Sequence, residues 1–238
     1  MSLEADPHRW FLDQLTKSEF FHQKLHEWQM LDIAEAIDCF LGEALEWDLP
    51  ALGISEVAWK KVIHRGVKPV TVFAHPEVLI LVPGATAYYR MLSMVSQKSM
   101  HRVGLSTNQY EVGSAVPNKD AAGRIALHLN KILSRLIELD ERVDPREFDL
   151  WRGMAAGTQA QGSWQNAKGA KVDAVIKGLI QRRLREKGWV IREAEGGTRM
   201  DLSDGRAVFF ADEPDIAVYR VDQIRAAVEI KGGIDPAG

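Results

Sequence analysis

Two short stretches near the C-terminal end hold residue types that together could hydrolyse a phosphate ester. They are Pro214-Asp215 and Glu229-Ile230-Lys231, and each borders an apolar run. Side chains alternate faces along a strand, so we expect Glu229 and Lys231 on one face and Ile230 on the other, with the Asp215 carboxylate brought to the same place by the neighbouring run. Two carboxylates with open positions suit Mg²⁺, which prefers oxygen ligands and keeps several waters. Lys231 would orient the attacking water or offset charge in the transition state.

A sheet must position these residues, and the last seventy residues of the chain predict one. Apolar residues recur at helical spacing over 172–184, and Gly188 is expected to end this helix. Closely spaced apolar runs follow, and Asp204-Gly205 is a strong hairpin-turn signal between two of them. The runs are residues 189–191, 199–202, 207–210, 216–219 and 226–230, and they predict three or four closely spaced strands after the helix. This order predicts an α/β unit with an at least partly antiparallel sheet.

The alternative interpretation of Glu229 and Lys231 is a solvated pair on an ordinary amphipathic strand. The setting favours a functional pair, because both stretches lie on apolar runs behind a helix that packs the sheet. Gly232-Gly233 is expected to end the last strand.

The two stretches resemble the signature of the PD-(D/E)XK nuclease superfamily. Pro214-Asp215 matches the PD half, and Glu229-Ile230-Lys231 matches the (D/E)XK half. The resemblance implies Mg²⁺-dependent phosphodiester hydrolysis, with Asp215, Glu229 and the Ile230 carbonyl as metal ligands and Lys231 as the catalytic lysine. It also implies a restriction-endonuclease-like mixed sheet with flanking helices, which is an α/β (α+β) fold.

A narrower resemblance is to the XcyI family of type II restriction endonucleases. It rests on Gln161-Gly162-Ser163-Trp164-Gln165-Asn166-Ala167, on residues 211–219 around Pro214-Asp215, and on residues 228–238. The layout is also similar, with residues 1–150 ahead of a catalytic core at 151–238. This resemblance implies cleavage of both strands of duplex DNA at the palindrome CCCGGG, leaving a 5′ overhang.

The surroundings of the motif suggest one additional residue and one departure from the superfamily. Asp173, beside the apolar face of the predicted helix, is a possible extra acid, with an ordinary surface aspartate as the alternative. The superfamily normally continues with a helix and a strand, but this chain ends seven residues after Lys231. We therefore expect an incomplete, truncated core.

Residues 1–150 predict a mainly helical region that provides scaffold, dimer surface and DNA contacts. Helical spacing extends over residues 9–47, 86–97 and 125–139. Val70–Phe73 and Val78–Val82 are short apolar runs bounded by prolines, which predicts strands. Glycine and polar residues predict loops over residues 103–123 and 156–169.

The net charge of −3 conceals blocks of opposite sign. Residues 1–50 hold three basic and eleven acidic side chains, and residues 60–135 hold eleven basic and three acidic ones. Residues 168–187 hold seven basic against two acidic, and residues 193–229 hold four against nine. Local basic fields attract a polyanion even when the total charge is negative. Neutralisation of the blocks by one another within the fold is the alternative.

Two sets of polar residues are the expected contacts to duplex DNA. Phosphate contacts, which give affinity without sequence information, are expected from Lys168, Lys171, Arg182, Arg183 and Arg185. Base contacts in a G·C-rich site favour cations that reach guanine, and the candidates are Arg90, Gln97, Lys98, Arg102 and Asn108. For each member of the second set, a solvated polar face is the alternative.

Other chemistries find little support. Cys39 is the only cysteine, which excludes an intrachain disulfide and a cysteine-built zinc site. His22 and His26 share a helix face, but no third ligand stands at metal spacing. There is no glycine-rich phosphate loop for a nucleotide cofactor. No membrane-length apolar run and no secretory signal is visible, so a cytoplasmic location is expected.

Two classes of function remain. The first is a site-specific endonuclease, expected to be a homodimer because a two-fold protein matches a palindrome. The second is a catalytically inactive DNA-binding or structural protein on a nuclease-like fold. A non-restriction nuclease of the same superfamily is a further option.

Overall fold

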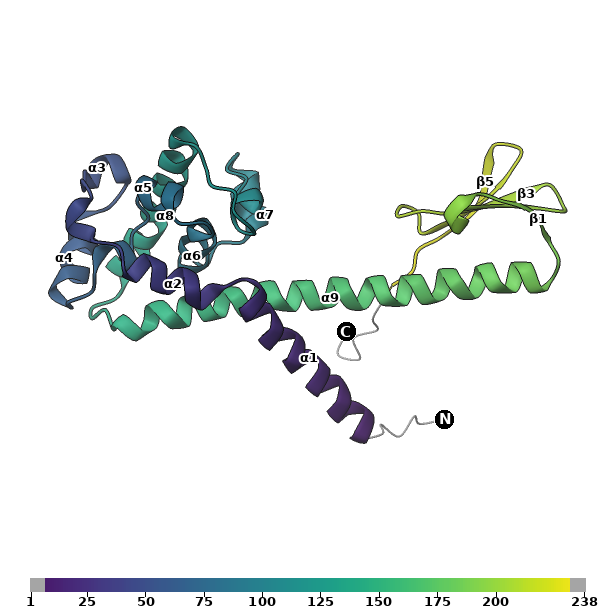
Figure 1. Cartoon of the computed structure of the whole chain (residues 1–238), viewed down its shortest axis with the longest axis horizontal. Coiled ribbons are helices and arrows are strands. Elements are labelled where there is room, and N and C mark those ends of the chain that lie inside the picture. The colour runs from purple at the N-terminus through teal and green to yellow at the C-terminus, as the bar shows by residue number, and fades with distance from the viewer. Residues whose placement is uncertain (1–6, 232–238) are drawn as a thin grey trace. The chain divides into compact units, whose positions relative to one another are not determined.

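The computed structural model describes residues 7–231 (Figure 1). The chain divides into two compact units, unit 1 over residues 1–161 and unit 2 over residues 162–238. Unit 1 is helical, and unit 2 combines a helix with a sheet, so the α+β class predicted from the sequence is confirmed.

Unit 1 is built from short helices that pack around one long helix, α8. The helices are α1 (Pro7–Glu27), α2 (Met30–Asp38), α3 (Leu49–Leu52), α4 (Glu56–His64), α5 (Pro76–Leu81), α6 (Ala85–Leu92), α7 (Gln97–Arg102), α8 (Lys119–Leu139) and the first part of α9 (Pro145–Glu186), with 3₁₀ turns η1 (Gly42–Ala44), η2 (Pro69–Thr71) and η3 (Asn108–Tyr110). Polar side chains start several of them. Asn118 caps α8 and Ser55 caps α4, each by accepting a hydrogen bond from a backbone N–H three residues on.

The core of unit 1 lies along α8. Leu129, Leu133 and Ile137 of this helix have no exposed surface, and α4 and α5 pack against it. One fully buried polar side chain, Asn130, interrupts this apolar face. Its Oδ1 accepts from the Ala74 N–H at 2.7 Å, and its Nδ2 donates to the carbonyls of Ala74 and Leu52. These bonds join α8 to the chain just before α5 and to the end of α3.

The predicted strands at Val70–Phe73 and Val78–Val82 are wrong. Val70 and Thr71 lie in η2 and Val72 and Phe73 in the turn after it, whereas the second run lies in α5 and the residue that follows it. Pro76 occupies the first position of α5, where a missing N–H costs nothing, and the His75 side chain accepts from the Glu77 N–H. The prolines therefore start helical turns here instead of bounding strands. Because these runs are apolar on several sides, their periodicity could not distinguish the two structures.

The predicted loop over residues 156–169 is also wrong, because α9 continues through it. No proline stands between Pro145 and Pro214, and alanine and glutamine favour a helix strongly enough to offset the glycines. The other predictions hold in outline. The helical region predicted at 9–47 contains α1 and α2, separated at Gln29 by left-handed backbone, and α8 covers 125–139. Residues 103–118 form an irregular segment that contains η3.

Unit 2 places one face of a sheet against the second part of α9. The strands are β1 (Val190–Glu193), β2 (Arg199–Leu202), β3 (Arg206–Phe210), β4 (Ile216–Arg220) and β5 (Gln223–Val228), with the 3₁₀ turn η4 (Glu195–Gly197) between β1 and β2. Each strand pairs with the next in sequence, and every pairing is antiparallel over the described residues. The sheet is therefore antiparallel instead of mixed, because short hairpins connect all of its strands.

A small core joins this sheet to α9. Met200, Phe210 and Ile216 are among its buried members, and Ile180 and Leu184 of α9 pack on them. The predicted turn at Asp204-Gly205 is present, with Gly205 at a φ of 82°. Gly188 follows the end of α9 at a φ of 66°, as the sequence predicts. The expected strand end at Gly232-Gly233 lies outside the described residues.

Candidate active site

The two halves of the predicted motif lie at the same end of the β4–β5 pair. Ile216 pairs with Val228, so continuing this register by one position sets Asp215 opposite Glu229. The Ile230 N–H donates to Oδ2 of Asp215 at 2.5 Å. The Asp215 carboxylate therefore reaches the backbone directly after Glu229, although β5 itself ends at Val228.

The triplet Glu229-Ile230-Lys231 alternates as predicted. Ile230 packs on the core of unit 2, whereas Glu229 and Lys231 point to solvent and form an ion pair with each other. The hydrogen bond from Lys231 to Glu229, followed by the charges of Glu229 and Asp215, raises the pKa of the lysine above its ordinary value. The site thus displays two carboxylates and one ammonium at the end of two strands.

Asp173 of α9 is linked to this end of the sheet through a lysine. Its Oδ2 lies 2.8 Å from Nζ of Lys177, and the same Nζ donates to the Ala211 carbonyl at 2.6 Å. The Ala211 N–H donates in turn to the backbone carbonyl of Asp215. Oδ1 of Asp173 is buried and has no hydrogen-bond partner among the described residues. The helix is therefore tied to the segment that carries Asp215.

Sequence reasoning missed Lys177. The signal was present, because an aspartate and a lysine four residues apart on a predicted helix lie on one face and attract each other.

The donor set at this site fits a hard divalent cation. Asp215 and Glu229 supply carboxylate oxygens just beyond the paired ends of β4 and β5. No group of three or more acidic, histidine or cysteine side chains gathers at metal-binding distance within residues 7–231. Mg²⁺ is compatible with a site of few protein ligands, since it retains several waters.

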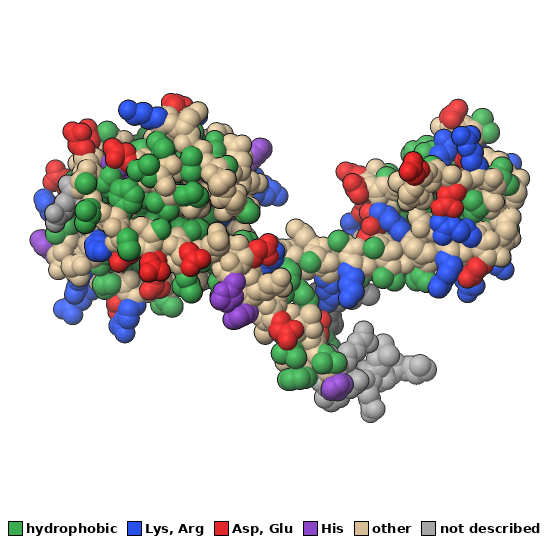
Figure 2. Space-filling model, in the orientation of Figure 1, with side chains coloured by type: hydrophobic (Ala, Val, Ile, Leu, Met, Phe, Trp, Pro, Cys, Tyr) green, Lys and Arg blue, Asp and Glu red, His purple; other side chains and the backbone are tan. Residues whose placement is uncertain are grey.

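The predicted phosphate contacts lie on the outer surface of α9. Lys168, Lys171, Arg182 and Arg183 are all exposed. Glu186 pairs with both arginines, at 3.0 Å from Arg183 and 3.8 Å from Arg182. Arg185 pairs with Glu193 of β1. Basic and acidic side chains are interspersed over unit 2 (Figure 2), so part of this basic block is neutralised locally.

Among the predicted base contacts, Arg90 needs a correction. It is 2% exposed, and its guanidinium bonds to Glu111, Val95 and Gln159 inside unit 1. Arg90 is therefore an interior residue that is not accessible to DNA, because its guanidinium pairs with the carboxylate of Glu111, 21 positions away in the sequence. Gln97 is half-buried and donates to Glu111, whereas Lys98, Arg102 and Asn108 are exposed.

The histidine pair of α1 stays a surface feature. Nε2 of His22 lies 3.4 Å from Nε2 of His26, and both side chains are exposed. No further metal ligand joins them within the described part of the chain. No helix among residues 7–231 has the length and apolar character needed to cross a bilayer.

Comparison with known families places the chain among the restriction endonucleases. The family model for the XcyI restriction endonuclease matches residues 43–238, which include the Asp215–Lys231 motif and most of unit 1. The chain therefore belongs to the XcyI restriction endonuclease family, as the sequence resemblance indicated. Neither the curated proteins nor the solved structures contain a match to it.

Proposed function

We propose that this chain is a Mg²⁺-dependent type II endonuclease that hydrolyses one phosphodiester bond in each strand of duplex DNA at a short G·C-rich palindrome. CCCGGG, cut to leave a 5′ overhang, is the site that the resemblance implies. The observation that carries the proposal is the placement of Asp215 opposite Glu229 at the end of β4 and β5, with Lys231 beside them.

In this proposal Asp215, Glu229 and the Ile230 carbonyl hold the metal ion. When bound, Mg²⁺ would offset the negative charge of the scissile phosphate and lower the pKa of a coordinated water. The chain fixes the Asp215 carboxylate through the Ile230 N–H, so this ligand is oriented before substrate arrives. Lys231, 81% exposed at its side chain, is able to leave Glu229 and place its ammonium against the phosphate or the attacking water.

Asp173 is proposed as an additional acid at this site. Its buried Oδ1 leaves one carboxylate oxygen available, while Oδ2 is held by Lys177. The hydrogen bond from Lys177 to the Ala211 carbonyl connects the part of α9 that carries Asp173 to the segment before β4.

DNA binding is proposed to use two groups of exposed side chains. Lys168, Lys171, Arg182 and Arg183 would contact phosphates and set affinity. Gln97, Lys98, Arg102 and Asn108 would contact base edges. In this division residues 151–238 form the catalytic part and residues 1–150 the scaffold.

Two-fold symmetry in the substrate suggests two copies of the chain. A homodimer would place one catalytic motif on each strand of a palindrome, and residues 1–150 would also supply its interface. Such an enzyme would act in the cytoplasm, where its DNA is found.

Plasmid cleavage tests the proposal. The protein should linearise supercoiled DNA in Mg²⁺ and leave it intact in EDTA, and sequencing of the fragment ends should show one palindrome with a 5′ overhang. Absence of cleavage with retained DNA binding would reject the enzyme in favour of a DNA-binding protein. Cleavage at many unrelated sequences would indicate a nuclease without restriction specificity.

A further inference from the structure

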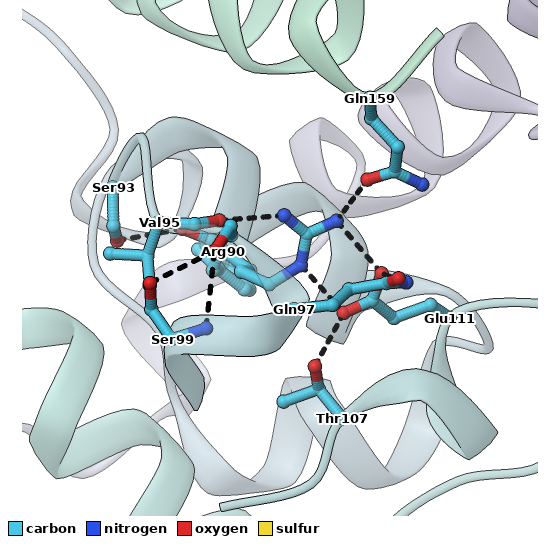
Figure 3. A network of polar contacts seen from close by, with 10 residues as sticks. Arg90, Ser93, Val95, Gln97, Ser99, Thr107, Glu111 and Gln159 are labelled. Atoms are coloured by element: carbon cyan, nitrogen blue, oxygen red, sulfur yellow. Dashed lines mark hydrogen bonds and ion pairs between the residues drawn. The ribbon is translucent and has the colours of Figure 1, made fainter. Parts of the chain in front are cut away.

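The most extensively bonded buried group in unit 1 is the ion pair between Arg90 and Glu111 (Figure 3). Nε of Arg90 donates to Oε1 of Glu111 at 2.6 Å, and Nη2 donates to Oε2 at 2.8 Å. Such a two-pronged pair fixes direction as well as distance. Both side chains are 2% exposed.

Further bonds spread this pair over four segments of unit 1. Arg90 belongs to α6, and its Nη1 donates to the Val95 carbonyl while Nη2 donates to Gln159 of α9. Glu111 also accepts from Thr107 and from Gln97 of α7, each at 2.6 Å. We call these side chains, with the Val95 carbonyl, the Arg90 network. It closes the segment 95–111 against α6 and α9.

The network also determines which charges this segment displays. Glu111 is the only acidic residue between Ser96 and Asn118. Burial alone would raise the pKa of Glu111, but the bonds and charge of Arg90, with the Thr107 and Gln97 bonds, lower it below the ordinary value. The carboxylate is thus ionised, turned inward and neutralised by Arg90. The charges that remain at the surface of the segment are Lys98 and Arg102, with His101 between them, and this surface suits a polyanion.

The segment is held by packing as well as by hydrogen bonds. Met100 is fully buried in the core of unit 1, and Leu105 and Tyr110 pack against that core. Beside these contacts an open pocket of about 200 Å³ is lined by Gly104–Ser106, Gln109 and Tyr110 and by Ala121, Arg124 and Ile125 of α8. The Arg90 network adds directional bonds to this packing and so orients the segment.

We propose that Arg90 and Glu111 are positioning residues for sequence discrimination by this endonuclease. They hold Lys98, Arg102 and Asn108 in the arrangement that reads base edges, without touching DNA themselves. Hydrogen bonds to bases require correct direction and distance, whereas phosphate attraction tolerates displacement. Loosening the network should therefore reduce specific binding and leave non-specific binding nearly unchanged. This inference rests on the proposed function, because it assumes that these exposed residues face DNA.

Two variants loosen the network without leaving a bare buried charge. Arg90→Lys keeps the cation but loses the planar fork, and with it the simultaneous bonds to Val95 and Gln159. Thr107→Val has nearly the same shape and removes one hydrogen bond to Glu111. Ser134→Ala is the matched control, because Ser134 is also buried and its hydroxyl oxygen accepts a hydrogen bond from the Ser55 N–H, away from the Arg90 network.

Selection of bound sequences from a randomised DNA duplex pool, in EDTA, supplies the readout without any cleavage. Wild-type protein should enrich one sequence, and its affinity ratio for that duplex over a scrambled duplex should fall at least tenfold in Arg90→Lys. Thr107→Val should reduce the ratio about threefold, and non-specific affinity should change less than twofold in both variants. Ser134→Ala should lower the melting temperature by a similar amount and keep the wild-type affinity ratio.

Three results would overturn the inference. The first is that wild-type protein enriches no sequence, the second that Thr107→Val and a folded Arg90→Lys keep the full ratio, and the third that Ser134→Ala loses the ratio equally. If Arg90→Lys fails to fold, Thr107→Val against Ser134→Ala decides alone. Because every binding step takes place in EDTA, a failure here is separate from a failure of Mg²⁺-dependent cleavage.

Discussion

The buried ion pair of unit 1 and the candidate motif of unit 2 differ in how completely their polar side chains are hydrogen-bonded. In unit 1 the notable polar residues are interior, and Arg90, Glu111 and Asn130 have their hydrogen-bonding groups matched by protein partners. In unit 2 the motif residues stand at the exposed ends of strands, and Glu229 and Lys231 have only each other as side-chain partners among the described residues. Asp173 has a buried oxygen with no such partner.

This difference distinguishes side chains that stabilise the fold from side chains that are available to bind a metal ion or a substrate. A buried charge with a complete set of partners has nothing left to offer a ligand, and its removal leaves a costly unpaired group. A carboxylate that is exposed or incompletely bonded contributes little to stability and remains free to bind a metal ion or a phosphate-bound water. Charge type alone, read from the sequence, does not make this distinction.

The largest expected effect on stability comes from breaking the buried pair of unit 1. Arg90→Met leaves the Glu111 charge in the interior without its main partner, which should reduce the free energy of unfolding by about 3–5 kcal/mol. Denaturant unfolding followed by tryptophan fluorescence measures it. Arg102→Met, at an exposed arginine of the same basic segment, should change stability by less than about 0.5 kcal/mol. Equal losses of stability in the two variants would contradict the structural role assigned to the buried pair.

Acid should weaken unit 1 through the same pair. The folded-state pKa of Glu111 lies below its ordinary value of 4.5, so its contribution is complete above about pH 4.5 and is lost as the pH falls through the folded-state pKa. Unfolding curves between pH 7 and pH 3 would show the loss. Glu111→Gln, although less stable at pH 7, should have a flatter pH dependence over the acid range. An unchanged slope in this variant would mean that other carboxylates cause the acid sensitivity.

The basic face of α9 should affect all DNA sequences alike. The double variant Arg182→Glu/Arg183→Glu removes two proposed phosphate contacts, so the slope of log affinity against log salt should become shallower by about 2. Fluorescence anisotropy with a short duplex over a salt series measures this slope. Arg220→Glu/Arg225→Glu changes the net charge of unit 2 equally and should have a smaller effect. Similar slopes for both double variants would mean that the net charge of unit 2, and not direct contact by α9, determines the salt dependence.

The smallest expected effect concerns the turn between β4 and β5. Val221 and Asp222 both have positive φ, at 49° and 59°, and they connect paired residues Arg220 and Gln223. Asparagine and glycine suit such a two-residue turn better than a β-branched residue does. Val221→Asn/Asp222→Gly should therefore stabilise unit 2 by about 0.5–1 kcal/mol in thermal unfolding. Val221→Thr, which keeps the branch, should give no gain.

The sequence predicted unit 2 better than unit 1 because its signals are local. The short apolar runs, the Asp204-Gly205 turn and the Gly188 helix end depend on neighbouring residues, and the strands, the turn and the helix end are all present. The order of short strands also favours hairpins, whereas the mixed sheet implied by the resemblance would need a long crossover. The positions of Asp215 and Glu229 next to the ends of adjacent strands follow from the same local pattern.

Unit 1 shows where local reasoning fails. The strands predicted around Val70 and Val78 are helical, because tertiary burial surrounds these apolar runs and removes any period. The capture of Arg90 by Glu111 depends on two residues 21 positions apart, with no motif to announce it. An arginine in a basic block looks the same in sequence whether it faces DNA or a buried carboxylate.

The rate of plasmid cleavage by Glu229→Gln in Mg²⁺ tests the central claim most directly. This substitution keeps the size of the side chain and removes one proposed metal ligand, so cleavage should slow at least roughly 100-fold. Melting temperature and DNA binding should stay close to wild type, because Glu229 is exposed. Glu213→Gln, at an exposed acid just before Pro214, is the matched control and should cleave normally. Cleavage by Glu229→Gln at the wild-type rate would contradict the account and remove Glu229 from the active site.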